Sequence, residues 1–255
     1  MAFDVSADAY ERFMGRFSTG LSAAFADFAG VADGAHLRVL DVGCGPGILT
    51  AELVSRVGAD RVAAVDPMPR FVERVQTALA GVDARTLPAE ELPFHSGTFD
   101  AALAQLVVPF MTDPVAGVRE MGRVCRPGGT VAASLWDHLG CRGPVSPFWT
   151  AVRALDPDVS GEDQQITQGR SHIPDVMVAA GLTDVVDTEL VTRLHFGAFD
   201  EWWAPYLLGV GPAGDYVAGL DNHGVDALRA ACLDILGAGP FDVEAVAWAA
   251  RGVAA

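Results

Sequence analysis

Residues 39–47 read Val-Leu-Asp-Val-Gly-Cys-Gly-Pro-Gly, and a second apolar run further on ends at Asp66. An apolar strand leads into a glycine-rich turn, a helix begins, and the next strand finishes on a carboxylate. This is how an α/β sheet holds a nucleoside. Glycines let the backbone turn and approach a ligand where a Cβ would clash. A carboxylate after the second strand can accept hydrogen bonds from a ribose diol, so the stretch predicts a nucleoside site.

Two details of this stretch indicate which nucleoside it holds. The glycines lie at Gly43, Gly45 and Gly47. The dinucleotide fingerprint G-x-G-x-x-G would need a glycine in place of Ile48. Asp41 also puts a carboxylate two residues before the first glycine. A pyrophosphate disfavours an extra anion there, whereas a ligand with a cationic ammonium group suits it.

Residues 41–47 resemble the first motif of class I S-adenosylmethionine-dependent methyltransferases. Residues 89–94 and 98–100 look like the segment that runs from the adenine pocket to the fourth strand of that class. Residues 119–129 look like the helix and turn before its fifth strand. The resemblance covers roughly residues 36–136. It is strongest to the branch of ubiquinone- and menaquinone-biosynthesis methyltransferases, which act on small molecules.

The resemblance implies a Rossmann-like, doubly wound α/β fold. We expect a mostly parallel seven-stranded sheet with an antiparallel last strand, an N-terminal helical cap and a small helical insert near the C-terminus. One methyltransferase domain would fill residues 1–255, with the cap at 1–35, the S-adenosylmethionine-binding core at 36–136, and acceptor-side loops, the insert and the last strands at 137–255. Alternating β-branched and helical stretches independently favour a parallel sheet with crossover helices.

The same alternation gives the expected elements. Predicted strands lie at 37–42, 61–66, 82–87, 99–106 and 129–136, with a final antiparallel pair at 184–196 and 243–251. Predicted helices lie at 47–58, 67–80 and 112–125, and residues 4–30 read as an amphipathic helix. The stretch 137–183 is rich in Gly, Pro and Asp and reads as a loop-and-helix connection.

Composition limits the partners. The formal net charge is -16, the chain contains no lysine, and no basic run could displace counterions from phosphates. DNA, RNA and anionic membranes are therefore not expected as partners. No apolar run approaches the roughly 20 residues that span a bilayer, and residues 1–4 do not resemble a signal peptide. The four scattered cysteines fit a reduced, cytoplasmic protein.

The resemblance assigns a role to each motif in binding S-adenosylmethionine, whose product is S-adenosylhomocysteine. Asp41 would face the ammonium group, directly or through water, and Asp66 would hold the ribose hydroxyls. Met68 would pack against adenine. A helix N-cap is a second role for Asp66, because Pro67 follows at what would be the first helical position. The full expected donor-binding set is Asp41, Gly43, Cys44, Gly45, Asp66, Pro67, Met68, Ala89, Glu90 and Gln105.

The adenine end departs from the usual pattern. Many relatives carry Asp where this chain has Pro88, so adenine recognition would rest on the Ala89 N–H and the Glu90 side chain, and we expect a somewhat weaker hold. Gln105 either touches the donor below the transferred methyl or is an ordinary strand-end amide. Cys44 needs only to be small at its place in the turn, and we do not expect it to be a nucleophile.

Methyl transfer from a sulfonium is an in-line displacement, so alignment of the nucleophile supplies much of the rate. Where the acceptor needs a general base, His138 is the first candidate and Asp137 its orienting partner; the alternative is a surface-loop histidine. Tyr10 is the second candidate, or an aromatic packed on the core. Arg16 would receive the donor carboxylate or be a solvated helix residue.

Two further groups of residues are considered for a metal site and for an acceptor pocket. His138 and Cys141 alone do not make a metal site, and we expect no metal. Four aromatic side chains either line an apolar acceptor pocket or form core: Phe148, Trp149, Trp202 and Trp203.

The expected function is methyl transfer to a small, apolar or aromatic molecule. Residues 105–110 read Gln-Leu-Val-Val-Pro-Phe, unlike the Asn/Asp/Ser-Pro-Pro-Tyr/Phe motif of methyltransferases that act on nucleobase amino groups. Two alternatives stay open at this point: an NAD-dependent oxidoreductase on a Rossmann-type fold, and a non-catalytic S-adenosylmethionine-binding protein. The acceptor, the attacking atom (O, N, C or S) and the oligomeric state are left open.

Overall fold

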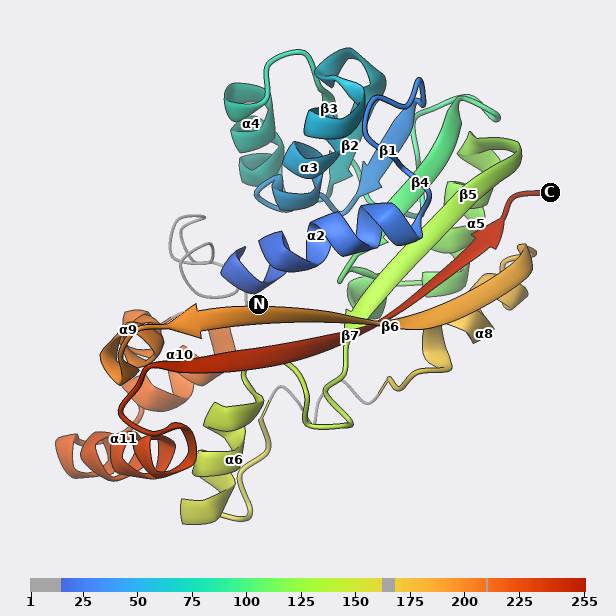
Figure 1. The fold of residues 1–255 in the computed structure, drawn as a ribbon. Helices are drawn as coiled ribbons and strands as arrows, with labels where there is room; N and C mark the ends of the chain where they lie inside the picture. Colours follow the sequence, from blue (N-terminus) through green and yellow to red (C-terminus); the bar gives the residue numbers. More distant parts are fainter. Residues whose placement is uncertain (1–14, 162–167, 210) are drawn as a thin grey trace. The chain divides into compact units, whose positions relative to one another are not determined.

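The computed structural model describes residues 15–161, 168–209 and 211–255. Its sheet has seven strands in the order β3-β2-β1-β4-β5-β7-β6 (Figure 1). The first four pairings in this order are parallel, whereas β7 runs antiparallel to both β5 and β6. The expected Rossmann-like sheet with an antiparallel last strand is therefore confirmed. The strands are β1 Val39–Val42, β2 Val62–Asp66, β3 Asp83–Thr86, β4 Phe99–Gln105, β5 Cys125–Trp136, β6 Thr183–Phe196 and β7 Phe241–Val253.

Helices connect the strands in the expected alternation. The α-helices are α2 Arg16–Phe28, α3 Ile48–Val57, α4 Pro69–Ala78, α5 Pro114–Val124, α6 Ser146–Leu155, α8 His172–Ala179, α9 Phe199–Trp203, α10 Gly211–Ala218 and α11 Asn222–Leu236. Short 3-10 turns are η2 Ala59–Arg61, η3 Val108–Phe110 and η4 Ala204–Leu208.

The described chain divides into two compact units. The larger unit comprises residues 21–135, 168–190 and 247–255, and the smaller unit comprises the rest. The larger unit therefore takes in α8 and the last part of β7 besides the predicted core. The predicted donor-binding residues all belong to it.

Apolar side chains cover both faces of the sheet in the larger unit. On one face Phe25 of α2 and Leu49 and Leu53 of α3 pack with Val39 and Leu103. On the other face, α5 and α8 supply the buried side chains Val118, Met121, Val124, Ile173 and Met177. The strands between them are buried on both faces, as their near-continuous apolar runs require.

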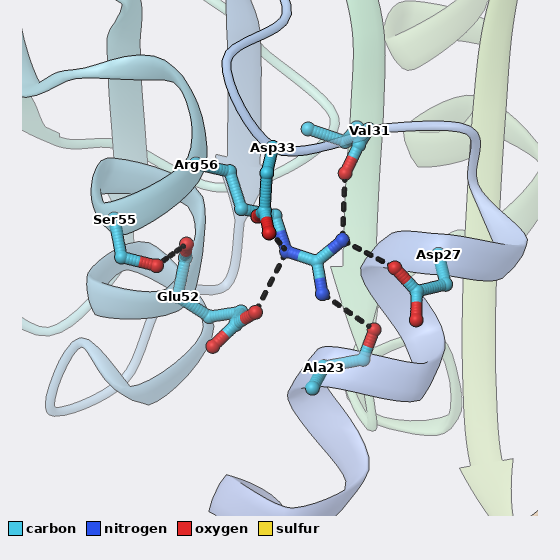
Figure 2. Close-up of polar contacts among 7 residues, drawn as sticks. All are labelled: Ala23, Asp27, Val31, Asp33, Glu52, Ser55 and Arg56. Atoms are coloured by element: carbon cyan, nitrogen blue, oxygen red, sulfur yellow. Dashed lines mark hydrogen bonds and ion pairs between the residues drawn. The ribbon is translucent and has the colours of Figure 1, made fainter.

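A buried arginine fastens α2 to α3 in this unit (Figure 2). The guanidinium of Arg56 donates to the carboxylates of Asp27 at 2.5 Å and Glu52 at 2.7 Å. It also donates to the carbonyl oxygens of Val31 at 2.8 Å and Ala23 at 3.0 Å. Because a buried cation is costly unless it is paired and hydrogen-bonded, these four partners explain why Arg56 is tolerated with a side chain only 7 % exposed.

The smaller unit has an aromatic core. The rings of Phe148 and Tyr206 stack with centroids 4.5 Å apart, and Trp202 lies 4.8 Å from Tyr206. Phe148, Trp149, Trp202 and Trp203 are all buried. Of the two interpretations made from sequence, these contacts favour core packing over the lining of a pocket.

Candidate functional site

The glycine turn lies at the carboxyl end of β1 and adopts backbone conformations that favour glycine. The φ angles of Gly43, Gly45 and Gly47 are 72°, 51° and 95°. A Cβ on Gly43 would come within 2.5 Å of Val107, and one on Gly47 within 2.9 Å of Val75. A Cβ on Gly45 would meet nothing within 4 Å. Gly43 and Gly47 are therefore needed for packing, whereas Gly45 borders open space that a ligand can enter.

The N–H groups of this turn are bound within the protein. Those of Gly43 and Cys44 donate to the carbonyl oxygen of Val65, at 2.8 and 3.0 Å. That of Gly45 donates to Asp66 at 2.9 Å, and that of Gly47 to the Cys44 carbonyl at 3.0 Å. Proline has no N–H at position 46. The turn therefore presents no N–H to a phosphate, in contrast to a dinucleotide-binding turn.

The side chain of Asp41, a residue of β1, lies at the N-terminal end of α3. The Thr50 hydroxyl donates to its carboxylate at 2.6 Å, and the Thr50 N–H also bonds to it. Only 1 % of Asp41 is exposed, and this burial raises the pKa of its carboxyl to about 7, with the nearby charge of Asp66 acting in the same direction. The Asp41 carboxyl thus lies where the N-terminus of a helix attracts an anion. A cation nearby would favour the ionised form of Asp41.

Asp66 joins the ends of two segments. One carboxylate oxygen accepts the Gly45 N–H at 2.9 Å and the other accepts the Met68 N–H at 2.8 Å. Burial raises the pKa of this carboxyl too, although these two N–H groups oppose the shift. A carboxylate offers about four acceptor positions, so two remain for the hydroxyls of a ribose.

The N-cap role considered for Asp66 is wrong. Helix α4 begins at Pro69 with Met68 as its cap residue, two positions later than expected. The carboxylate of Asp66 accepts the N–H groups of Gly45 and Met68 instead. Pro67 is exposed and Met68 is half-buried beside Asp66.

On the expected adenine side, Ala89 is buried and Glu90 half-buried. The Leu87 N–H donates to the Asp66 carbonyl at 3.1 Å, which ties the start of this segment to the ribose side. The Glu90 carboxylate accepts the N–H of Asp113 at 3.1 Å. Glu90 therefore fastens the segment to the start of α5, and this contact uses one of the acceptor positions considered for adenine.

Gln105 ends β4 beside Ser134 of β5. The next residue, Leu106, has φ 64° and donates its N–H to the Ser134 carbonyl at 3.0 Å. A leucine rarely adopts this left-handed conformation, and such strain is found mainly at functional sites. The strand end that carries Gln105 is therefore held in an unusual backbone path.

The base candidates lie elsewhere. His138 belongs to the smaller unit, where it is buried in the turn after β5. The neighbouring Asp137 accepts hydrogen bonds from the Gly140 N–H at 2.9 Å and from Arg142 at 2.6 Å. Asp137 thus orders this turn, and its role towards the imidazole stays a prediction. Tyr10 lies outside the described residues.

Two further residues considered from the sequence are Arg16 and Cys44. Arg16 pairs with Glu201 at 2.9 Å and lies over the Phe196 ring, so its charge is engaged within the smaller unit. This does not favour the donor-carboxylate role. Burial raises the pKa of the Cys44 thiol far above its ordinary value and so favours the protonated thiol, which agrees with the expectation that Cys44 is not a nucleophile.

Sequence reasoning missed Thr50, the partner of Asp41, and the pair Glu120 and Arg123 in α5, described below. Thr50 could have been found, because a hydroxyl in the first turn of the helix after the glycine turn is well placed to meet the strand-end acid. Among the described residues, no group of three or more His, Cys, Asp or Glu side chains is arranged to hold a metal ion. No helix in the described ranges has the length and apolar character of a membrane span.

Comparisons with known proteins cover this same region. Residues 40–133 match the family model described as a methyltransferase domain. The 2-methyl-6-phytyl-1,4-hydroquinone methyltransferase 2, chloroplastic, of Oryza sativa subsp. japonica is 40 % identical over 116 residues, which are 44 % of this chain and 31 % of that protein. The ubiquinone biosynthesis O-methyltransferase of Methylocella silvestris is 41 % identical over 102 residues, 38 % of this chain and 39 % of that one. The matched part is thus less than half the length of either curated relative.

A solved structure extends the similarity in fold. A phosphoethanolamine N-methyltransferase 2 of Haemonchus contortus, in complex with phosphomonomethylethanolamine and S-adenosylhomocysteine, superposes with a TM-score of 0.58 at 16 % identity. The match covers 97 % of this chain and 56 % of that one. At this identity the likeness concerns the fold alone. The family model and the curated relatives thus show that residues 40–133 are similar to a methyltransferase domain, and the sheet has the Rossmann-like topology of such domains.

Proposed function

We propose that this chain transfers a methyl group from S-adenosylmethionine to a small, apolar or aromatic acceptor. One observation carries the proposal. Two buried carboxylates, Asp41 near the end of β1 and Asp66 at the end of β2, lie beside a turn whose N–H groups are already bound within the protein. Such a site offers acceptors and negative charge. It suits a ligand with an ammonium group, a sulfonium and a ribose diol.

The residues present fit this donor. The open space beside Gly45 admits a ligand against the backbone. The remaining acceptor positions of Asp66 suit ribose hydroxyls, and the charge of Asp41 suits the ammonium. A dinucleotide fits poorly, because its pyrophosphate would meet the carboxylate of Asp41 in place of free N–H groups.

When bound, S-adenosylmethionine supplies an electrophilic methyl group on a sulfonium. This chain would contribute orientation: Asp66 would hold the ribose and the backbone of residues 43–45 the methionine part. Met68 would pack against the adenine, and the Ala89 N–H would meet its edge. Gln105 would lie at the strand end below the methyl group. Because in-line displacement depends on alignment, these contacts would supply much of the rate.

The acceptor class is supported by the curated relatives, which are named for hydroquinone methylation and for ubiquinone biosynthesis. A phenolic hydroxyl would need a base, for which His138 and Tyr10 remain the candidates. The free cysteines found among the described residues agree with the expected cytoplasmic setting.

Calorimetry with S-adenosylhomocysteine tests donor binding. Wild-type protein should bind it, and NADH should not compete; no measurable binding at millimolar concentration would overturn the proposal. A metabolite pool incubated with S-adenosylmethionine should then form S-adenosylhomocysteine together with a methylated product, which mass analysis identifies. Binding without turnover in any pool would favour the non-catalytic alternative.

A further inference from the structure

Residues 87–97 form a segment without helix or strand between β3 and β4. Its start is fixed by the bond from the Leu87 N–H to the Asp66 carbonyl. The Glu91 N–H then donates to the Pro88 carbonyl at 3.3 Å and closes a turn around Ala89. Backbone groups outside regular structure need partners from elsewhere, and here many of them come from α5.

Two side chains of α5 hold the far end of the segment. Arg123 donates to both carboxylate oxygens of Glu120, at 2.6 and 2.8 Å. The same guanidinium donates to the carbonyl oxygens of Leu92 at 3.0 Å and Phe94 at 2.9 Å. Glu120 accepts the Leu92 N–H at 3.2 Å. Both polar backbone groups of Leu92 are thus bound by one ion pair.

The part of the segment around residues 89–90 is held against α5 as well. The Glu90 carboxylate accepts the Asp113 N–H just before α5. A Cβ on Gly117 of α5 would lie 3.3 Å from the Cβ of Ala89, so this glycine lets the helix approach the turn closely. Ala89 is consequently held on both sides, by the end of β2 and by α5.

The ion pair has a geometry that few other residues could provide. Arginine presents several N–H donors in a rigid plane, so one side chain can bind a carboxylate in two places and two carbonyls at once. A lysine would supply a charge but not this fork. The pair is partly exposed, with Arg123 at 35 % and Glu120 at 24 %, so its effect on overall stability is expected to be modest.

We propose that Glu120 and Arg123 are positioning residues that set the base preference of the donor site. They hold the turn at residues 88–92 so that the backbone N–H of Ala89 reads the edge of adenine, in a chain where Pro88 offers no acidic side chain. A backbone N–H can donate to N1 of adenine, whereas N1 of hypoxanthine carries its own hydrogen. A rigid turn therefore rejects hypoxanthine, and a loosened turn does so less well. The inference rests on the proposed function.

The test compares binding of S-adenosylhomocysteine and S-inosylhomocysteine by calorimetry. Wild-type protein should prefer the adenine compound by about tenfold or more, the effect of opposing two donors. Arg123→Gln should weaken S-adenosylhomocysteine binding by about tenfold and bring the preference close to one. Arg126→Gln is the matched control, because the guanidinium of Arg126 pairs with Asp100 of β4. It should keep the wild-type preference.

Glu120→Gln keeps the shape of the side chain and is expected to reduce the preference less than Arg123→Gln does. It decides the question if Arg123→Gln fails to fold. A folded variant at either position with the wild-type preference would overturn the inference, and so would wild-type protein that binds both compounds equally. Wild-type protein that binds neither compound would overturn the proposed function as well.

Discussion

One carboxylate oxygen of Asp66 lies 2.9 Å from the backbone nitrogen of Gly45, which is 21 residues earlier in the chain. This bond joins the end of β2 to the turn that follows β1. The residue expected to hold the ribose thus also fixes the turn expected to hold the methionine part, and neither half of the site is independent of the other.

Replacing Asp66 therefore affects the whole donor site. Asp66→Ala removes a charged acceptor, and hydrogen bonds to charged groups contribute about 1.5–3 kcal/mol each, so we expect S-adenosylhomocysteine binding to weaken by at least about 100-fold. Asp60→Ala is the control, because Asp60 is an exposed carboxylate at η2. Equal affinity of wild type and Asp66→Ala in calorimetry would refute the ribose role.

Gly45 allows a test of the open space beside it. Gly45→Ala places a methyl group where a ligand is expected and puts alanine at φ 51°, which costs roughly 1–2 kcal/mol of unfolding free energy. Gly34→Ala has the same backbone cost at φ 71°, also with open space, but in the exposed loop before β1.

Both glycine variants should lose similar stability in urea unfolding. Only Gly45→Ala should lose affinity for S-adenosylhomocysteine, by about tenfold or more. Equal affinities of the two variants would mean that the ligand does not approach this backbone.

The raised pKa of Asp41 predicts a pH dependence of donor binding. Below about pH 7 the free protein holds Asp41 protonated, whereas an ammonium group favours the ionised form. Affinity for S-adenosylhomocysteine should fall as the pH drops from 8 towards 5.5, approaching tenfold per unit.

Asp41→Asn should bind more weakly at pH 8 and lose this dependence. Because the folded-state pKa lies above the ordinary value of 3.8, the folded protein binds the proton more tightly, and the contribution of Asp41 to stability falls as pH rises towards 7. The unliganded Asn variant should therefore melt at a higher temperature than wild type at pH 8. A lower melting temperature would contradict the assigned burial of charge.

The Arg56 cluster predicts a purely structural effect. Arg56→Met leaves Glu52 and two carbonyl groups without their donor, and we expect a loss of about 3 kcal/mol in unfolding free energy. Asp27→Ala should lose less than about 1 kcal/mol, since 71 % of that side chain is exposed. Urea unfolding measures both, and equal losses would show that the buried guanidinium is not the main contributor.

The core elements were predictable because their signals are local. The strand β1, the turn and α3 follow from apolar runs and glycine spacing, and their bounds differ from the prediction by one or two residues. The start of β5 was less predictable. The strand begins at Cys125 and not at 129, because Cys125 pairs with Phe99 of β4 and because Gly128 and Gly129 exchange hydrogen bonds with Ala254, near the far end of the chain. Residues 127–129 alone look like a turn.

In the candidate site, too, some features follow from the local sequence and others depend on contacts between distant parts of the chain. Asp41 and Asp66 were predicted as site residues from their places at strand ends, and the structure confirms only those places. The start of α4 was missed because the Asp66 carboxylate accepts the N–H groups of Gly45 and Met68, and Met68 takes the cap position. The role of Arg123 depends on carbonyl groups 29 and 31 residues earlier in the chain, which no local pattern shows.

The contact between Asp41 and Thr50 has a consequence for selection among metabolites. Cells contain abundant nucleoside phosphates, whose ribose and adenine parts are shared with S-adenosylmethionine. In this chain the carboxylate of Asp41, when ionised, already occupies the position at the start of α3 where an anion would bind. A phosphate placed there would meet this carboxylate, so the site favours the proposed cationic ligand over a nucleotide.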